Sequence, residues 1–361
     1  MSSPEIPSKM KALVLEAPNK YGVRWVDTPK PGPYEVLVRV RAVAICGSDP
    51  PLLSGTFAGG KYPLFYPMIP GHEWAGEIVA LGPGVDEFKI GDRVAGEAHK
   101  GCGLCSMCKK GRYNLCENFG NMEKGHRWYG FIANGAYAQY QVYSIKAIHK
   151  IPDTMSFEEG AMVDTTAIAL HGLKRAGVPP GGTVVIIGPG PVGLCALQCA
   201  QALGAGRIIM LGRGHGGKSS RMKMAKELGA ELVDVQVEDP IKRVLEMTNG
   251  KGADLVVECS GADIACSWTI DLVRKGGSIV LIGNYKKPIS LPMFKVVFNE
   301  ISIYGSRGNP NASDEAIGLI ASGKVDVKKL ITHVFSLDEF DKALETFVKR
   351  LDGAIKVIVK P

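Results

Sequence analysis

A strand, a glycine-rich turn and a helix follow one another in the middle of this chain. The apolar run Thr183–Ile187 leads into Gly188-Pro-Gly190-Pro-Val-Gly193, and an apolar helical segment begins at Leu194. Three more apolar runs of strand length are spaced by helix-length segments: 207–211, 254–259 and 278–282. Strands that are apolar throughout and alternate with helices are typical of a parallel sheet covered on both faces. The sequence therefore predicts a parallel α/β domain over residues 159–299.

The three glycines have distinct expected roles in binding a dinucleotide. Gly188 allows the tight turn, Gly190 lets the backbone approach a pyrophosphate, and Gly193 lets helix and strand pack closely. The phosphates would then lie at the N-terminus of the following helix, where free amides favour anions, and Pro191 and Val192 of the turn are expected among the cofactor contacts. The motif alone is weak evidence, but the strand before it and the helix after it make it specific.

The residue about 20 positions further on indicates which dinucleotide binds, because a carboxylate there binds the ribose 2′-hydroxyl and repels a 2′-phosphate. This chain has neutral Gly212 at that place, followed by three cations: Arg213, Lys218 and Arg221. Cationic side chains can bind a phosphate, so the sequence favours NADP over NAD. The alternative is an exposed basic loop that makes no contact with the adenine ribose, in which case NAD binds.

Four of the nine cysteines form a compact cluster with the spacing C-x2-C-x2-C-x7-C: Cys102, Cys105, Cys108 and Cys116. Four thiolates around one zinc ion leave no open coordination position, so the spacing predicts a structural zinc site. An iron–sulfur cluster also takes four cysteines, but the ferredoxin spacings differ. A nucleic-acid zinc ribbon usually has two separated C-x2-C pairs, whereas this chain has one compact cluster.

The first part of the chain has a different rhythm. From about residue 10 to residue 151, short runs of alternating polarity are separated by Pro/Gly turns, which is typical of an antiparallel, barrel-like β region. After residue 301 come two helical segments and a closing strand. We therefore expect a barrel-like domain formed by residues 1–158 and 300–361, around the dinucleotide domain.

Composition excludes several classes of protein. The 361 residues are 45% hydrophobic and 22% charged, and no apolar run approaches the length of a membrane span. The start of the chain lacks the features of a signal peptide, so a cytoplasmic location is expected. The net charge of +7 is spread along the chain, which argues against a nucleic-acid partner.

Two short motifs in the β region complete a pattern. Cys46-Gly-Ser48-Asp49 follows one predicted strand, and Gly71-His72-Glu73 opens another. In order with the four cysteines and the glycine turn, they resemble the zinc-dependent medium-chain dehydrogenase/reductase family, which includes alcohol, polyol and threonine dehydrogenases. The resemblance implies an α/β fold: a Rossmann dinucleotide-binding domain plus a GroES-like β-barrel catalytic domain. It also implies a homodimer or homotetramer, paired through the strand near 278–283.

The resemblance assigns roles to matching residues. Cys46 and His72 match the first two ligands of a catalytic zinc, and Asp164 is the expected third. The alternative for Asp164 is a helix N-cap. Glu73 is expected beside the metal or as an alternate ligand. Further cofactor contacts are expected at Ile282, Gly283, Ser306 and Arg307. With the four-cysteine site, two zinc ions per chain are expected.

The expected reaction follows from these roles. Zinc polarises the oxygen of an alcohol or ketone, a hydride passes to or from the nicotinamide, and Ser48 takes the hydroxyl proton. Many relatives have a histidine about three residues later as the outer end of the proton relay, but this chain has Pro51. The relay therefore ends in water, the cofactor ribose or another group.

The substrate is expected to be a secondary alcohol or ketone. The segments that flank the site in relatives are aromatic in this chain. They contain Phe57, Tyr62, Phe65, Tyr66 and 126–131. If they line the pocket, they favour a bulky or cyclic alcohol; the alternative is that they form core contacts. An NAD-dependent polyol or threonine-type dehydrogenase is the second hypothesis for the activity. A zinc-free reductase and a silent dinucleotide-binding protein are disfavoured, because Cys46, His72 and a junction carboxylate are all present.

Overall fold

The computed structural model describes residues 5–361, which divide into two compact units. The first unit contains the chain up to residue 164 together with 313–321 and 327–361. The second contains 165–312 and 322–326. Within residues 5–361 no helix is both long enough and apolar enough to cross a membrane.

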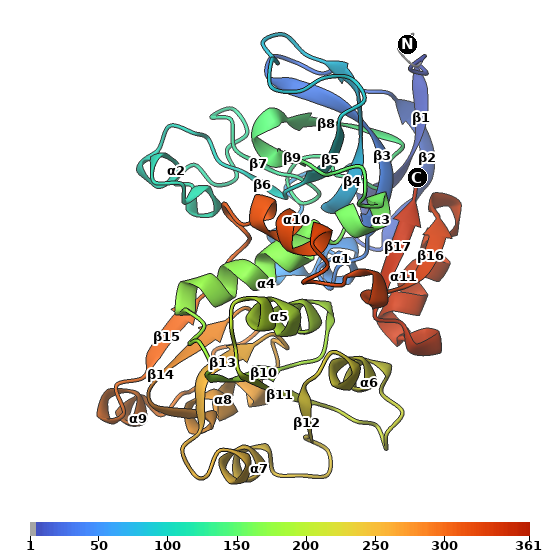
Figure 1. The fold of residues 1–361 in the computed structure, drawn as a ribbon. Helices are drawn as coiled ribbons and strands as arrows, with labels where there is room; N and C mark the ends of the chain where they lie inside the picture. Colours follow the sequence, from blue (N-terminus) through green and yellow to red (C-terminus); the bar gives the residue numbers. More distant parts are fainter. Residues whose placement is uncertain (1–4) are drawn as a thin grey trace. The chain divides into compact units, whose positions relative to one another are not determined.

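The second unit is built on a six-stranded parallel sheet (Figure 1). Its strands, in spatial order, are β12 (Glu231–Asp234), β11 (Arg207–Gly212), β10 (Thr183–Ile187), β13 (Ala253–Glu258), β14 (Val273–Leu281) and β15 (Ser302–Gly305). In chain order this is 3-2-1-4-5-6, with the reversal between β10 and β13, as in doubly wound dinucleotide-binding sheets. Val184 to Ile187 are all buried, which explains why β10 is apolar throughout.

Helices cover both faces of this sheet. They are α4 (Val163–Ala176), α5 (Pro191–Ala202), α6 (Ser220–Glu227), α7 (Pro240–Met247), α8 (Asp263–Leu272) and α9 (Met293–Phe298). α5 contacts α6, and α7 contacts α8, as expected for successive right-handed crossovers on opposite faces. Ser219 and Asp239 cap α6 and α7 by accepting hydrogen bonds from first-turn amides, which fixes where these helices begin.

The last strand of this sheet changes two expectations. β15 pairs in parallel with β14, so residues 300–312 belong to the second unit, whereas we expected the catalytic domain to resume at 300. The expectation that copies pair through 278–283 is wrong for most of that segment. β14 has β13 on one side and β15 on the other, so neither of its edges is open.

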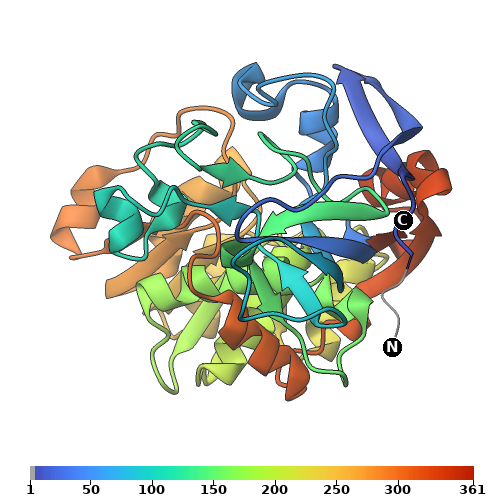
Figure 2. The same cartoon turned by 90° about the horizontal axis from the view of Figure 1, so that it is seen from above.

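The first unit is mainly antiparallel. Its largest sheet contains, in spatial order, β16 (Ile331–Ser336), β17 (Lys356–Lys360), β3 (Glu35–Ala44), β4 (Glu73–Leu81), β5 (Arg93–Gly96) and β9 (Ile148–Lys150), with β8 (Tyr140–Ser144) also paired to β3. Two small sheets accompany it: β1 (Lys9–Ala17) with β2 (Lys20–Asp27), and β6 (His99–Lys100) with β7 (Arg127–Trp128). Figure 2 shows the C-terminal strands, in red, beside the blue N-terminal strands, where β17 pairs with β3.

Exposed and buried side chains alternate along β3, so one face of this strand packs on the core. Arg39 and Arg41 are exposed, whereas Val38, Val40 and Ala42 are buried, because successive side chains of a strand point to opposite faces.

The helices of this unit are short: α1 (Asp49–Leu53), α2 (Ser106–Lys109), α3 (Phe157–Gly160), α10 (Ser313–Ala321) and α11 (Phe340–Lys349). Six single turns of 3₁₀ helix lie at Phe57–Gly60, Tyr113–Leu115, Ile145–Ala147, Lys328–Leu330, Leu337–Glu339 and Leu351–Gly353.

A buried carboxylate joins distant segments of the first unit. Glu97 accepts hydrogen bonds from Tyr113 Oη at 2.7 Å and from Ser313 Oγ at 2.6 Å. The His149 ring lies between two acids, with Nε2 at 3.2 Å from Glu97 Oε1 and Nδ1 at 2.7 Å from Asp314 Oδ1. Burial opposes a charged imidazole here, but the hydrogen bonds to Glu97 and Asp314 outweigh it and raise the pKa of His149.

This network predicts a pH-dependent contribution to stability. Because the folded pKa of His149 lies above the unfolded value of about 6.5, the stabilisation is fully present below pH ~6.5 and is lost as the pH rises through the folded pKa. We expect His149→Gln to lower the melting temperature by about 3 °C at pH 6, and by less toward pH 9. Thermal unfolding across that range checks this, and a deficit that is constant with pH would contradict it.

Candidate active site and metal centres

Three potential metal ligands converge in the first unit. Cys46 follows the end of β3, His72 precedes β4, and Glu73 is the first residue of β4, directly opposite Ala44 in the antiparallel pair. One donor atom from each lies within 4.8 Å of the others, and His72 and Glu73 are buried. The pairing of β3 with β4 therefore brings together residues that are 26 positions apart.

Asp49, which we did not assign a role from the sequence, stands behind His72. Its Oδ2 accepts hydrogen bonds from the Cys46 amide and the Tyr137 hydroxyl, both at 2.8 Å. Its Oδ1 lies 3.8 Å from His72 Nδ1, and within the described part of the chain neither atom has a hydrogen-bond partner. A carboxylate behind one imidazole nitrogen is the arrangement that orients a metal-ligating histidine. The sequence signal was present, since Asp49 ends the Cys-Gly-Ser-Asp motif.

Lys356 of β17 was also missed. This lysine is buried, and its Nζ forms an ion pair with Glu73 Oε2. Burial raises the pKa of the Cys46 thiol well above its usual range, the Glu73 carboxylate raises it further, and Lys356 opposes both. A divalent cation among these donors would stabilise the thiolate, so a thiolate–imidazole–carboxylate set fits zinc.

Asp164 lies beside this group. It is the second residue of α4, within the first helical turn, so the alternative of an N-cap is wrong. Burial raises the pKa of Asp164 to about 7, against the lowering effect of His72. Its oxygens are not among the donor atoms within 4.8 Å, so the structure gathers Cys46, His72 and Glu73 and leaves Asp164 next to them.

Ser48 is the residue before α1, and its Oγ is buried. It lies close enough to the Cys46 thiol to lower the pKa of that thiol. Pro50 and Pro51 occupy the first turn of α1, where a missing amide hydrogen costs nothing. The helix start therefore explains the prolines that replace the relay histidine of many relatives.

Aromatic rings extend from His72. The Phe131 ring centroid lies 4.7 Å from the His72 ring, and Trp128 stacks on Phe131 at 4.1 Å. Phe57 lies 5.2 Å from Phe131, and Tyr62 lies 5.2 Å from Trp128. We call these four rings, Phe57, Tyr62, Trp128 and Phe131, the aromatic cluster.

The rest of the two aromatic segments lies elsewhere. Phe65 packs on the main core of the first unit, and Tyr66 is exposed. Arg127 donates from Nη1 to the Met122 and His126 carbonyls at 2.7 and 2.9 Å.

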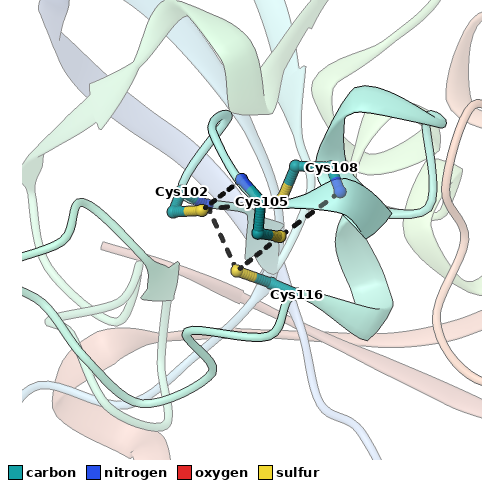
Figure 3. Close-up of side chains that lie close together, drawn as sticks. All are labelled: Cys102, Cys105, Cys108 and Cys116. Atoms are coloured by element: carbon teal, nitrogen blue, oxygen red, sulfur yellow. Dashed lines mark hydrogen bonds between the residues drawn. The ribbon is translucent and has the colours of Figure 1, made fainter.

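The four cysteines face one another (Figure 3). Sγ of Cys102 lies 4.0 Å from Sγ of Cys108, and Sγ of Cys105 lies 3.9 Å from Sγ of Cys116. Four sulfurs bound to zinc at about 2.3 Å stand about 3.8 Å apart, so the separations fit a tetrahedral ion. Hydrogen bonds to the sulfur, led by the Asn118 side chain, lower the pKa of Cys102 to about 6, whereas burial raises the pKa of Cys108 and of Cys116. Zinc requires thiolates, so its binding would release protons from these two cysteines.

Loss of this site should destabilise the chain. We expect Cys102→Ser to lower the melting temperature by ~10 °C or more and to promote aggregation, because the lobe at 101–118 has only short helical turns of its own. Cofactor affinity of the remaining folded protein should be unchanged. Calorimetry with metal analysis checks this, with Cys199→Ser in α5 as the control. A stable variant that holds one zinc fewer would show that the metal of this lobe is dispensable.

The glycine turn has the expected backbone. Gly188 has φ +100°, and a Cβ there would lie 2.8 Å from Ser260 Cβ. A Cβ on Gly193 would lie 2.0 Å from the Gly188 carbonyl oxygen, so this glycine lets α5 pack on the turn. Gly190 precedes Pro191 and Val192 at the start of α5, and the Arg221 guanidinium lies 3.9 Å from the position of its missing Cβ.

The loop after β11 brings cations to this turn. Arg213 and Lys218 are exposed, and Arg221 in the first turn of α6 lies beside Gly190. A carboxylate does lie nearby, because Asp234 ends the adjacent strand β12 and accepts a hydrogen bond from the Gly214 amide at 2.8 Å. Asp234 thus holds the loop in place.

Gly212 has a role that we did not predict. A Cβ at this position would lie 2.5 Å from Met222 Sδ and 2.7 Å from the Pro189 ring. The absence of a side chain therefore lets β11 pack against the glycine turn, and does more than leave room for a phosphate.

The four remaining expected cofactor residues follow β14 and β15. Ile282 and Gly283 donate their amides to the Glu258 carbonyl at 2.9 and 3.0 Å. Ser306 donates its amide to Leu281, and its buried Oγ has no partner within the described residues. Arg307 is exposed. All four lie at the carboxyl end of the parallel sheet, where such sheets bind ligands.

Comparisons with known proteins agree with this geometry. Residues 32–153 match the model of the alcohol dehydrogenase GroES-like domain, and residues 191–322 match that of the zinc-binding dehydrogenase. The chain is 35% identical to a sorbitol dehydrogenase of Bacillus subtilis, over 99% of this chain and 98% of that protein. It belongs to the zinc-dependent medium-chain dehydrogenase/reductase family. The resemblance and the fold class, a Rossmann domain with a GroES-like domain, are confirmed.

Two further members of this family are informative. A D-arabitol-phosphate dehydrogenase of Enterococcus avium is 35% identical over 97% of both chains. A zinc-binding dehydrogenase of Sinorhizobium meliloti, solved bound to NADP, superposes with a TM-score of 0.89 at 32% identity, over 98% of this chain and 100% of that one. The protein is therefore an oxidoreductase of the NAD(P)-dependent zinc alcohol dehydrogenase type.

Proposed function

We propose that the protein interconverts a secondary alcohol and its ketone with NADP, at a zinc ion held by Cys46, His72 and Glu73. The observation that carries this is the set of three donors within 4.8 Å, two of them buried, with Asp49 behind the histidine. When bound, the zinc supplies a Lewis acid for the substrate oxygen. An open fourth position on such a zinc is what a catalytic site needs.

The chain's own residues take four roles in this proposal. Asp49 orients the His72 ring, and Lys356 balances part of the negative charge of Glu73. Ser48 accepts the hydroxyl proton of the substrate and passes it outward, since its buried Oγ lies next to Cys46. Asp164 supplies a second buried carboxyl group beside the donors, which differs from its expected role as third ligand.

Together with the four-cysteine site, this gives two zinc ions per chain. Metal analysis of purified protein should find about two, one of them lost on replacing Cys46. A value of one in the wild-type protein would contradict the catalytic site or the structural one, and the Cys46 and Cys102 variants would identify which.

We favour NADP because cations surround the end of β11 and no acid occupies position 212. One solved relative is bound to NADP and another to NADH, so this preference rests on the charges of this chain. Arg221, in the first turn of α6, lies beside Gly190, and Arg213 directly follows β11, so both could contact a 2′-phosphate. The nearby Asp234 accepts hydrogen bonds from the amides of Gly214 and Gln236.

For the substrate, we propose an alcohol with an apolar or cyclic body. The aromatic cluster begins 4.7 Å from the His72 ring, and ring faces bury apolar area well but leave hydroxyls without partners. A polyol is the second candidate, supported by the names of the relatives, sorbitol and D-arabitol-phosphate dehydrogenases.

An initial-rate screen separates these candidates. Cyclic secondary alcohols and open polyols are compared, each with NAD and NADP in parallel. We expect a higher kcat/KM for the cyclic alcohols and for NADP. A higher value for sorbitol or arabitol would favour the polyol hypothesis, and no turnover by zinc-loaded protein with any alcohol would overturn the proposed function.

We further propose that two copies pair through β15 and α9. β15 lies at the edge of the sheet, and α9 exposes four large apolar side chains: Met293, Phe294, Val297 and Phe298. Light scattering should give twice the chain mass or a multiple of it, and Phe298→Asp should lower that mass.

The proposed location is the cytoplasm, which agrees with nine cysteines that are all free of disulfides.

A further inference from the structure

A buried carboxylate at the end of β13 lies outside every role assigned above. Glu258 is the last residue of β13 and has no exposed surface. The Oε1 atom of Glu258 accepts hydrogen bonds from the Ser260 amide at 2.7 Å and from the Ser260 hydroxyl. The Gly261 amide donates to both carboxylate oxygens. The Tyr285 hydroxyl donates to Oε2 at 2.5 Å. Every one of these partners is a donor, which suits an ionised carboxylate.

These bonds join two loops at the carboxyl end of the sheet. Ser260 and Gly261 belong to the loop after β13, and Tyr285 belongs to the loop after β14. The loops touch closely, because a Cβ on Gly283 would lie 2.3 Å from Glu258 Oε2 and one on Gly261 would lie 2.8 Å from the Asn284 carbonyl. Glu258 therefore fixes how the two loops meet.

The position of this contact relative to the glycine turn is informative. A Cβ on Gly188 would lie 2.8 Å from Ser260 Cβ, and one on Gly193 would lie 3.6 Å from Cys259 Cβ. In a sheet of order 3-2-1-4-5-6, the dinucleotide crosses the reversal between the first and fourth strands. The half read by the loop after β11 carries the adenine ribose, so the other half, with the nicotinamide, lies over β13 and β14.

We propose that Glu258 is a positioning residue for the nicotinamide half of the cofactor. It holds the loops after β13 and β14 together, and its buried negative charge favours the oxidised, positively charged ring over the neutral reduced ring. The inference rests on the proposed binding of NADP. Glu258 has no exposed surface, and electrostatic interactions are weakly screened where solvent is excluded.

The test measures the binding of each cofactor form by calorimetry, without turnover. Glu258→Gln keeps the size of the side chain and one of its two acceptor oxygens, and removes its charge. We expect it to raise the Kd of NADP⁺ by about tenfold and that of NADPH by about twofold or less. Tyr285→Phe keeps the charge and loosens the loops, so both Kd values should rise together. Glu300→Gln, an exposed carboxylate of the same unit, is the matched control and should change neither value.

Each outcome decides a part of the proposal. Equal effects of Glu258→Gln on both forms would overturn the charge effect, and unchanged affinities in Tyr285→Phe would overturn the positioning of the loops. Should Glu258→Gln fail to fold, Glu258→Asp replaces it, and a change in the ratio of the two Kd values would count against the charge effect. If the wild-type protein binds neither NADP⁺ nor NADPH, the proposed function itself fails. If the wild type binds both and the variants bind them equally well, only the role proposed for Glu258 fails.

Discussion

Replacing Cys46 or His72 by alanine is expected to lower kcat by about three orders of magnitude or more, while NADP still binds. The two residues belong to one set of three donors, and removing one ligand from a three-ligand site should release a metal that would polarise the substrate oxygen. Several kcal/mol of transition-state stabilisation would then be lost, at a factor of ten in rate for each ~1.4 kcal/mol. Steady-state kinetics, metal analysis and a cofactor titration on the same samples measure the three consequences.

Two controls separate this effect from general damage. Cys199→Ala changes a buried cysteine of α5, and His333→Ala changes a partly buried histidine of β16, and neither residue belongs to a donor set. Both should retain two zinc ions and normal turnover. Wild-type turnover in Cys46→Ala and His72→Ala would place the reactive centre elsewhere in the chain.

Metal analysis of variants also decides whether Glu73 or Asp164 is the third ligand of the proposed catalytic zinc. We expect Glu73→Gln to reduce zinc retention more than Asp164→Asn, because only Glu73 has an oxygen within the donor set. Lys356 would lose its ion-pair partner in Glu73→Gln, so Lys356→Met is examined beside it. Greater zinc loss from Asp164→Asn would restore the role that the family resemblance implied for that residue.

The parts of the site that the sequence predicted are local in the chain. The glycine turn lies within a strand–turn–helix unit, and β10 spans the predicted residues Thr183–Ile187. The four cysteines lie within 15 residues, so their spacing alone restricts the geometry of the cluster. In both cases the chemistry needs glycine or cysteine at fixed offsets, and no distant segment has to be placed.

The missed contacts depend on strand pairing over long separations. Lys356 meets Glu73 because β17 and β4 both flank β3, although 283 positions separate the two residues. A lysine in an apolar closing strand gives no sign of its partner in a single sequence. Short strands such as β12 and β15, with four residues each, were missed because they carry too few positions to show a period. β15 in turn decided the domain boundary.

Gly212 illustrates how a correct residue can be assigned for an incomplete reason. The sequence shows that no acid occupies the end of β11, and the structure adds that no side chain fits there without moving the Pro189 ring. Converting Gly212 to aspartate to favour NAD would therefore disturb the glycine turn itself. A test of cofactor preference has to use the cations.

Arg213→Ala combined with Arg221→Ala should move the preference from NADP toward NAD by about two decades in kcat/KM. A 2′-phosphate carries nearly two negative charges, and a charge-assisted contact to an arginine contributes ~1.5 to 3 kcal/mol, or about one to two decades in affinity. The full sum of two contacts is not expected, because neighbouring residues that share one ligand are not additive. NAD, which lacks the phosphate, should lose little.

The comparison needs a variant that removes the same kind of charge from the same unit. Arg243→Ala in α7 serves this purpose, because Arg243 is exposed and its charge is paired with Glu238 and Glu246. It should leave the ratio of NADP to NAD efficiency unchanged. If the wild-type protein already prefers NAD, the basic loop after β11 is a solvated surface, and the roles of Arg213, Lys218 and Arg221 fall together. If the wild type prefers NADP but the double variant keeps that preference, the phosphate is bound by other groups, and the amides at the start of α5 become the next residues to examine.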